Sequence, residues 1–309
     1  MIDVQNVTKA YGAFEAVKDV SFSVEQGEIL GFLGPNGAGK TTMMKMITCY
    51  MPPTGGRITV DGLDVINDSM GVRKKIGYLP ESTPLYEEMG VRDYLHFIAD
   101  VRKVNGADRS RAMDRVISVT GLSKVIHKDI HELSKGYRQR VGFAQAIIHD
   151  PEILVLDEPT TGLDPNQIIE IRNLIRELGE SKTVIFSTHI MQEVQATSDR
   201  VLIIDQGQIA AQGTAEELKA SVAGQMHLDI VLRDADKSKF IEVVNGIDQV
   251  HMEDIKLQKN GDLEAALKVD AGVDLREQLF DLAVSNQWKI LESSPSSFTL
   301  EDVFRKLTN

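Results

Sequence analysis

A glycine-rich segment near the N-terminus, GPNGAGKTT at 34–42, has the residue types and spacing that bind phosphate. Glycines let backbone N–H groups close around phosphate oxygens, and the helix that is expected to follow adds a favourable dipole. In such a phosphate loop Lys40 reaches the β- and γ-phosphates of a nucleoside triphosphate, and the Thr41 hydroxyl ligates Mg²⁺. The residues expected to hold the nucleotide are Gly34, Asn36, Gly37, Gly39, Lys40, Thr41 and Thr42.

Two adjacent carboxylates, Asp157 and Glu158, end an apolar run at 153–158. Ligands of α/β folds collect at the edge of the sheet where parallel strands end. Asp157 suits the outer Mg²⁺ shell, and Glu158 suits the general base that orients and deprotonates the attacking water. A carboxylate pair after a strand is usually only solvated. Together with the phosphate loop, however, this pair predicts phosphoryl transfer.

The elements that must position these residues predict an α/β fold over about the first 215 residues. The runs at 27–34, 152–158, 182–188 and 199–205 are nearly continuous in apolar residues, as buried parallel strands are. The opening segment alternates apolar and polar residues instead, which predicts an antiparallel β subdomain. Helical spacing over about 85–150 predicts a helical subdomain inserted into the α/β domain.

The rest of the chain predicts a second, smaller domain. Small residues at 219–225 indicate a linker, which leaves a nucleotide-binding domain at 1–218 and an accessory domain at 226–309. The accessory domain reads as a β-α-β-β-α-β series, typical of a ferredoxin-like α+β fold. We expect it to regulate the first domain or to support a dimer.

The segment LSKGYRQR at 133–140 connects these motifs. Alone, it reads as a helix that Ser134 caps and whose residues 138–140 form a solvated face. With the phosphate loop and the carboxylate pair in the same order, the first 215 or so residues resemble the P-loop ATPase cassette of an ABC transporter. The small second domain and the ending SSFTLEDVFRKLT resemble the type 2 exporter group, which includes drug-resistance, sodium-export and gliding-motility cassettes.

This resemblance implies roles for further residues. Two copies are expected to enclose two ATP molecules, with Ser134 and the Gly136 amide of one copy binding the γ-phosphate held by the other. By the same resemblance Tyr11 stacks on adenine, His189 contacts the γ-phosphate, and Asp164 crosses the dimer interface. Each also has a structural alternative: a strand-end aromatic, a capping or core histidine, and a turn former before a proline.

Three departures from the family pattern stand out: Lys135 and Tyr137 in the segment LSKGY, and Glu81 where many relatives have glutamine. Glu81 still accepts a water or ligates Mg²⁺, but it cannot donate a hydrogen bond. The segment 84–95 is, by resemblance, the surface that receives the membrane subunit. Its alternative is a plain helical surface.

The composition of the chain argues against several classes of function. A net charge of -12 argues against broad binding to nucleic acid, and a single cysteine, Cys49, suits a reducing compartment. No run approaches the roughly 20 apolar residues of a membrane span, and the start shows no signal peptide. We therefore expect an ATPase that powers transport, most simply export, from the cytoplasmic face of the cell membrane.

Its expected partners are membrane-spanning permease subunits and a second copy or a related ATPase subunit, with no nucleic acid. The alternative is a soluble ABC-type ATPase that acts on ribosome or DNA complexes. Such proteins usually carry two cassettes or a long coiled coil, and this sequence shows neither.

Overall fold

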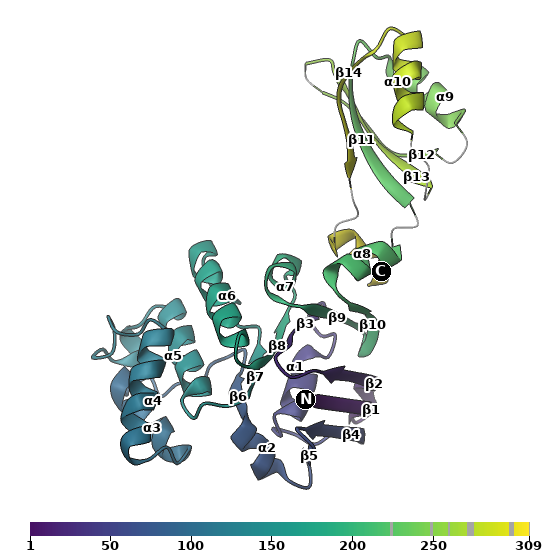
Figure 1. Ribbon diagram of the computed structural model, residues 1–309. Coiled ribbons are helices and arrows are strands. Elements are labelled where there is room, and N and C mark those ends of the chain that lie inside the picture. Colours follow the sequence, from purple (N-terminus) through teal and green to yellow (C-terminus); the bar gives the residue numbers. More distant parts are fainter. Residues whose placement is uncertain (223–224, 248–249, 259, 271–274, 297–299, 309) are drawn as a thin grey trace. The chain divides into compact units, whose positions relative to one another are not determined.

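The computed structural model describes residues 1–222, 225–247, 250–258, 260–270, 275–296 and 300–308 (Figure 1). The chain divides into two compact units, Met1–Thr214 and Ala215–Asn309. The N-terminal unit contains two sheets and a group of helices, whereas the C-terminal unit contains one sheet with its own helices.

The larger sheet of the N-terminal unit consists of β3 (Ile29–Leu33), β6 (Ile76–Leu79), β7 (Ile153–Asp157), β8 (Thr183–Thr188), β9 (Arg200–Asp205) and β10 (Gln208–Gly213). Their order is β10-β9-β3-β8-β7-β6, with β10 antiparallel to β9 and the other pairs parallel. Every residue of β3, β7 and β8 is buried, which explains their continuous apolar sequences. The predicted parallel sheet is confirmed.

The smaller sheet consists of β1 (Ile2–Tyr11), β2 (Phe14–Val24), β4 (Gly55–Val60) and β5 (Leu63–Asp64). Its strands are antiparallel in the order β2-β1-β4-β5. Helix α1 (Lys40–Ile47) contacts both sheets, through β7 on one side and β2 and β4 on the other. Met43, Met44 and Ile47 are fully buried in the core that the two sheets share. The phosphate loop therefore leads directly into a helix that is anchored in the core.

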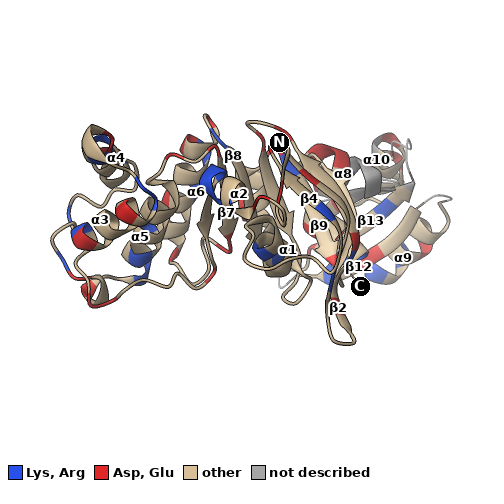
Figure 2. Cartoon of the chain, turned by 90° about the horizontal axis from the view of Figure 1, so that it is seen from below, with Lys and Arg blue, Asp and Glu red and all other residues tan. Residues whose placement is uncertain are grey.

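The predicted helical subdomain lies between β6 and β7. It contains α3 (Val91–Val101), α4 (Gly106–Val119), the 3₁₀ turn η1 (Ile130–Glu132) and α5 (Lys135–Ile147). Helix α5 packs against α3, α4 and β6. Three further helices belong to the N-terminal unit: α2 (Ser69–Lys75), α6 (Pro165–Gly179) and α7 (Met191–Thr197). Figure 2 shows basic and acidic residues interspersed along α3 to α6.

The C-terminal unit consists of α8 (Ala215–Val222), β11 (Gln225–Arg233), α9 (Lys237–Asn245), β12 (Val250–Leu257), β13 (Leu263–Asp270), α10 (Arg276–Ser285), β14 (Lys289–Ser296) and α11 (Leu300–Leu307). The sheet order is β12-β13-β11-β14, with all pairs antiparallel. The first and third strands of the series are central, as in a ferredoxin-like fold, which confirms that prediction. Phe240 and Trp288 pack against each other in the core, with ring centroids 5.8 Å apart.

The predicted linker at 219–225 is corrected by the structure. Residues 219–222 continue α8, residue 225 begins β11, and residues 223–224 lie outside the described residues. The division between the units falls after Thr214 rather than after residue 218. Small residues misled the prediction because alanine is also the best helix former. Glu216 and Glu217 in the first turn further favour the helix.

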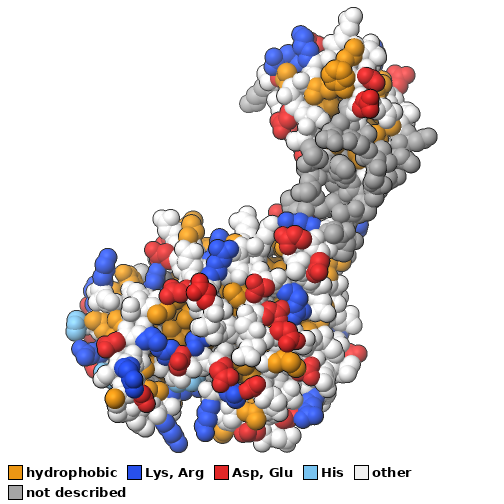
Figure 3. Space-filling model, viewed as in Figure 1, with side chains coloured by type: hydrophobic (Ala, Val, Ile, Leu, Met, Phe, Trp, Pro, Cys, Tyr) orange, Lys and Arg blue, Asp and Glu red, His pale blue; other side chains and the backbone are white. Residues whose placement is uncertain are grey.

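No helix among the described residues is long and apolar enough to cross a membrane. Figure 3 shows that hydrophobic side chains reach the surface in separate patches among charged ones. In the C-terminal unit the exposed apolar side chains include Phe280 and Val284 of α10. In the N-terminal unit they include Tyr86 and Phe97, whose rings pack edge to face.

Candidate active site

The phosphate loop joins β3 to α1, and two of its glycines are required by close packing. A Cβ atom on Gly34 would lie 2.4 Å from the Ile204 carbonyl oxygen, and one on Gly39 would lie 2.5 Å from that of Ala16. Gly39 also has a φ of 107°, a conformation that side chains disfavour. Helix α1 begins directly after it, so its first N–H groups face the loop.

A pocket of about 490 Å³ opens beside this loop. It is lined by Tyr11, Phe14, Ala16, Asn36, Gly37, Ala38, Gly39, Lys40, Thr41, Thr42, Glu81 and Glu158. The structure thus brings together predicted residues from four separate segments. Tyr11 at the rim is half exposed, and its hydroxyl donates to Met51 Sδ at 3.0 Å. Phe14, which the sequence analysis missed, pairs with Tyr11 across the β1–β2 hairpin and adds a second exposed aromatic ring.

The Glu158 carboxylate contacts three other side chains at the pocket. It lies 3.3 Å from Lys40 Nζ and 2.9 Å from His189 Nδ1, and only 7% of the Glu158 side chain is exposed. The Thr161 hydroxyl donates to the same carboxylate at 2.9 Å. Glu158 also has a φ of 48°, which is uncommon for a residue other than glycine. These contacts hold one carboxylate between a lysine and a histidine at the end of β7.

Lys40 extends back over the loop that precedes it. Its ammonium donates to the carbonyl oxygens of Gly34 at 2.7 Å and Pro35 at 3.1 Å. Because its side chain is buried together with that of Glu158, their ion pair is poorly screened by solvent. A buried cation beside a glycine-rich loop that leads into a helix N-terminus is suited to bind phosphate.

Asp157 directly precedes Glu158, and only one of its two carboxylate oxygens is hydrogen-bonded among the described residues. Its Oδ1 accepts hydrogen bonds from Ser187 Oγ at 2.6 Å and Thr41 Oγ1 at 3.1 Å. Its buried Oδ2 has no hydrogen-bond partner among the described residues. Burial raises the pKa of Asp157, and the charges of Glu81 and Glu158 add to this shift, although the two hydrogen bonds oppose it.

A divalent cation fits this arrangement. The orphaned Asp157 oxygen and the Thr41 hydroxyl are hard oxygen ligands beside the phosphate loop, and Glu81 lies on the pocket rim. Mg²⁺ in nucleotide sites usually takes one or two protein ligands and completes its shell with phosphates and water. Among the residues that the structure describes, no three His, Cys, Asp or Glu side chains are grouped to hold a metal ion by themselves.

Ser134, Gly136 and Asp164 do not line this pocket. Ser134 is exposed and caps α5, accepting from the Tyr137 N–H at 3.5 Å. Asp164 caps α6 and accepts from the Gln167 N–H at 2.9 Å. A Cβ atom on Gly136 would lie 2.6 Å from the Gln167 side chain, so the starts of the two helices touch.

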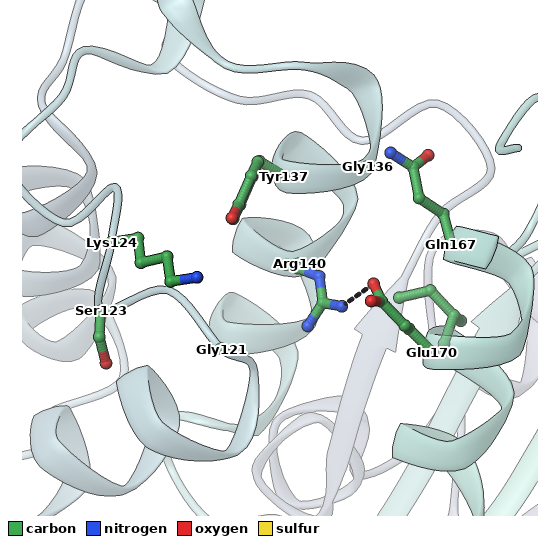
Figure 4. A pocket seen from close by; sticks show the side chains of 9 residues that line it. Gly121, Ser123, Lys124, Gly136, Tyr137, Arg140, Gln167 and Glu170 are labelled. Carbon is green, nitrogen blue, oxygen red and sulfur yellow. Dashed lines mark hydrogen bonds and ion pairs between the residues drawn. The ribbon is translucent and has the colours of Figure 1, made fainter.

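A second pocket, of about 330 Å³, lies beside the start of α5 (Figure 4). It is lined by Gly121, Ser123, Lys124, Gly136, Tyr137, Arg140, Gln167, Glu170 and Ile171. Arg140 forms an ion pair with Glu170 and donates to the Thr120 carbonyl oxygen at 2.9 Å. Helix α5 is thereby joined to α6 and to the end of α4, and Arg140 is not part of a simple solvated face.

Two polar residues near Glu158 were missed by the sequence analysis. Ser187 Oγ accepts from the Glu158 N–H at 3.0 Å in addition to its bond with Asp157, and it is fully buried. Its position at the end of β8, two residues before His189, was a usable signal. Gln139 was placed on a solvated face but is only 7% exposed, and its amide donates to the Pro159 carbonyl oxygen.

Comparison with known proteins matches the sequence of the chain to one family. The sequence profile of the ABC transporter family matches residues 17–161. The linearmycin resistance ATP-binding protein LnrL of Bacillus subtilis is 31% identical, over 100% of this chain and 98% of the relative. The bacitracin transport ATP-binding protein BcrA of Bacillus licheniformis is 33% identical, over 99% of this chain and 97% of the relative.

Solved structures agree with the sequence relatives. The chain resembles the dimeric ATP-binding cassette MJ0796 bound to ADP and Pi, with a TM-score of 0.64 and 26% identity, over 69% of this chain and 98% of that one. It also resembles an ATP-binding subunit of an ABC transporter, with a TM-score of 0.66 and 26% identity, over 79% of this chain and 99% of that one. Since relatives more than 30% identical align over nearly its whole length, the chain belongs to the ABC transporter family, among its ATP-hydrolysing subunits.

Proposed function

We propose that two copies of this chain bind two ATP molecules between them and hydrolyse them to drive export through separate membrane-spanning subunits. The observation that carries this proposal is the position of Glu158. Its carboxylate is fixed between Lys40 and His189 at the edge of a pocket lined by the phosphate loop. This arrangement supports the transfer of a proton from water beside a bound γ-phosphate.

The polar and aromatic residues at the pocket have different roles in the proposed reaction. The backbone N–H groups at 36–41 and Lys40 bind the phosphates, and Tyr11 with Phe14 offers aromatic surface to the base. Glu158 accepts the proton of the attacking water, and His189 keeps its carboxylate oriented. When bound, Mg²⁺ neutralises phosphate charge; Thr41, Asp157 and Glu81 are the residues that would hold it.

Ser134 and Gly136 act in this proposal on the nucleotide of the partner copy. They lie at the N-terminus of α5, which has no acidic residue in its first turn, so the positive end of the helix dipole is available to a phosphate. The dimeric state of the related cassette bound to ADP and Pi supports the same arrangement.

The relatives named for linearmycin resistance and for bacitracin transport support a membrane partner and a transported small molecule. We place the chain on the cytoplasmic face of the membrane, where it meets the membrane subunits through the segment 84–95. The exposed aromatic rings of Tyr86, within this segment, and Phe97, two residues beyond it, offer apolar contact area.

Substitution of Glu158 by glutamine tests the proposal. Glu158→Gln keeps the size of the side chain but removes the base, so turnover should fall by about 10²-fold or more while ATP binding persists. We expect ATP to convert this variant into a stable dimer, measured by size-exclusion chromatography with light scattering.

Glu152→Gln is the matched control, because Glu152 lies just before the same strand and is exposed, with a surface ion pair to Lys75. It should hydrolyse ATP at the wild-type rate. Retained turnover in Glu158→Gln would rule out the assigned base, and absence of ATPase activity in the wild-type protein would rule out the proposed function.

A further inference from the structure

The buried side chain of Gln139 connects α5 to two other segments: the loop after Glu158 and the loop after Glu81. Gln139 lies on α5, one turn after the residues that are proposed to bind the partner's nucleotide. Its Nε2 donates to the Pro159 carbonyl oxygen at 2.8 Å, and its Oε1 accepts from Thr83 Oγ1 at 3.3 Å. Pro159 directly follows Glu158, and Thr83 lies two residues after Glu81.

The two hydrogen bonds use both ends of the amide. Because only 7% of Gln139 is exposed, loss of either bond leaves a polar group without compensating water. The loop that contains Thr83 also packs closely on α5 elsewhere: a Cβ atom on Gly142 would lie 2.6 Å from the Thr83 methyl group. Gln139 is therefore the polar part of a tight contact between α5 and this loop.

The position of Gln139 allows a movement of α5 to be transmitted to the loop next to Glu158. Gln139 is five positions after Ser134, which corresponds to about 7.5 Å along the helix axis. A shift of the start of α5 must therefore move the amide and, through Pro159, the backbone next to Glu158. In the proposed function Ser134 binds the nucleotide held by the partner, whereas Glu158 acts on the nucleotide of its own copy.

We infer that Gln139 is a positioning residue that sets the Glu158 loop relative to α5 and thereby links the two nucleotide sites of the dimer. The inference rests on the proposed function. Its chemical requirement is specific: one donor for the Pro159 carbonyl oxygen and one acceptor for the Thr83 hydroxyl. A side chain of similar volume without these groups should fill the space but not hold the loop.

The test compares Gln139→Met with Gln145→Met. Gln145 lies on the same helix and accepts a hydrogen bond from the Tyr94 hydroxyl, a contact remote from Pro159. Both variants remove a glutamine of α5 that hydrogen-bonds to another segment, Gln139 being buried and Gln145 half-buried, so both should lower the melting temperature. Only Gln139→Met should lower kcat for ATP, by about tenfold, with little change in KM.

Thr83→Val tests the two hydrogen bonds of Gln139 separately. It removes the Thr83 hydroxyl but leaves the Gln139 Nε2 that donates to the Pro159 carbonyl oxygen. We expect a fall in kcat of about threefold, and no further loss when Thr83→Val is added to Gln139→Met. Equal kcat values for Gln139→Met and Gln145→Met, at matched melting temperatures, would overturn the inference. That result would leave the proposed function intact, since the wild-type protein and Glu158→Gln test it separately.

Discussion

The surroundings of Glu158 and those of Ser134 differ in how their polar groups are used. Around Glu158, buried carboxylates, a lysine, a histidine and hydroxyl groups from α1, β7, β8 and the loops after the two strands contact one another. Around Ser134, the polar side chains mainly cap the helices on which they lie, and Ser134 itself is exposed. The first region is assembled within one chain, whereas the second presents its groups to the outside.

This difference explains why two copies are needed in the proposed function. In the proposed function the Glu158 region supplies a base, a phosphate-binding lysine and metal ligands. The Ser134 region supplies a helix N-terminus with an uncommitted dipole. A nucleotide that contacts both regions must lie between two chains, because Ser134 does not line the phosphate-loop pocket of its own chain.

One substitution in each region tests this difference. Removal of the Ser187 hydroxyl, near Glu158, should have the larger effect on ATPase activity. Ser187→Ala takes one donor from Asp157 and one acceptor from the Glu158 N–H. Without the hydrogen bond that opposes the upward shift, the pKa of Asp157 should rise further, so protons compete better with Mg²⁺. We expect turnover or Mg²⁺ affinity to fall by about 10- to 100-fold, measured by ATPase assays over a Mg²⁺ titration.

Thr183→Val is the control for Ser187→Ala, because Thr183 lies at the other end of β8 and accepts from the Gly27 N–H. It should cost stability but leave the Mg²⁺ dependence unchanged. An identical Mg²⁺ dependence in Ser187→Ala and the wild-type protein would show that Ser187 does not support Asp157.

A smaller effect is expected at the start of α5. The added methyl group in Gly136→Ala must push the Gln167 side chain away, and this side chain is flexible. We therefore expect only a few-fold loss of ATPase activity, through disturbance of the cap at Asp164. Adding Gly136→Ala to Gln167→Ala should cost nothing more, since the clash is already gone. A further loss in that double variant would place the role of Gly136 outside this contact.

Sequence reasoning predicted the larger sheet, the phosphate loop and Glu158 because each depends on local signals. Continuous apolar runs, glycines at fixed offsets and a carboxylate pair after a strand all have short-range physical causes. Ser187 and Gln139 were missed for a different reason. Their roles depend on which strand and which loop lie beside them, and a glutamine between two arginines gives no local sign of burial.

The boundary between the two units was misplaced because small residues suit both a linker and a helix. Ala220 and Ser221 were interpreted as linker residues, but they continue a helix that begins with two acidic residues. Helix propensity and the favourable charge in the first turn were the stronger signals.

The most direct test of the account is complementation between two inactive variants. Lys40→Ala removes the phosphate-binding lysine, and Ser134→Arg blocks the start of α5, so each protein alone should have almost no ATPase activity. In an equal mixture, half of the dimers combine the two, and each mixed dimer has one intact site, which predicts about a quarter of wild-type activity. A mixture that stays inactive, although light scattering shows mixed dimers, would contradict an active site shared between two chains.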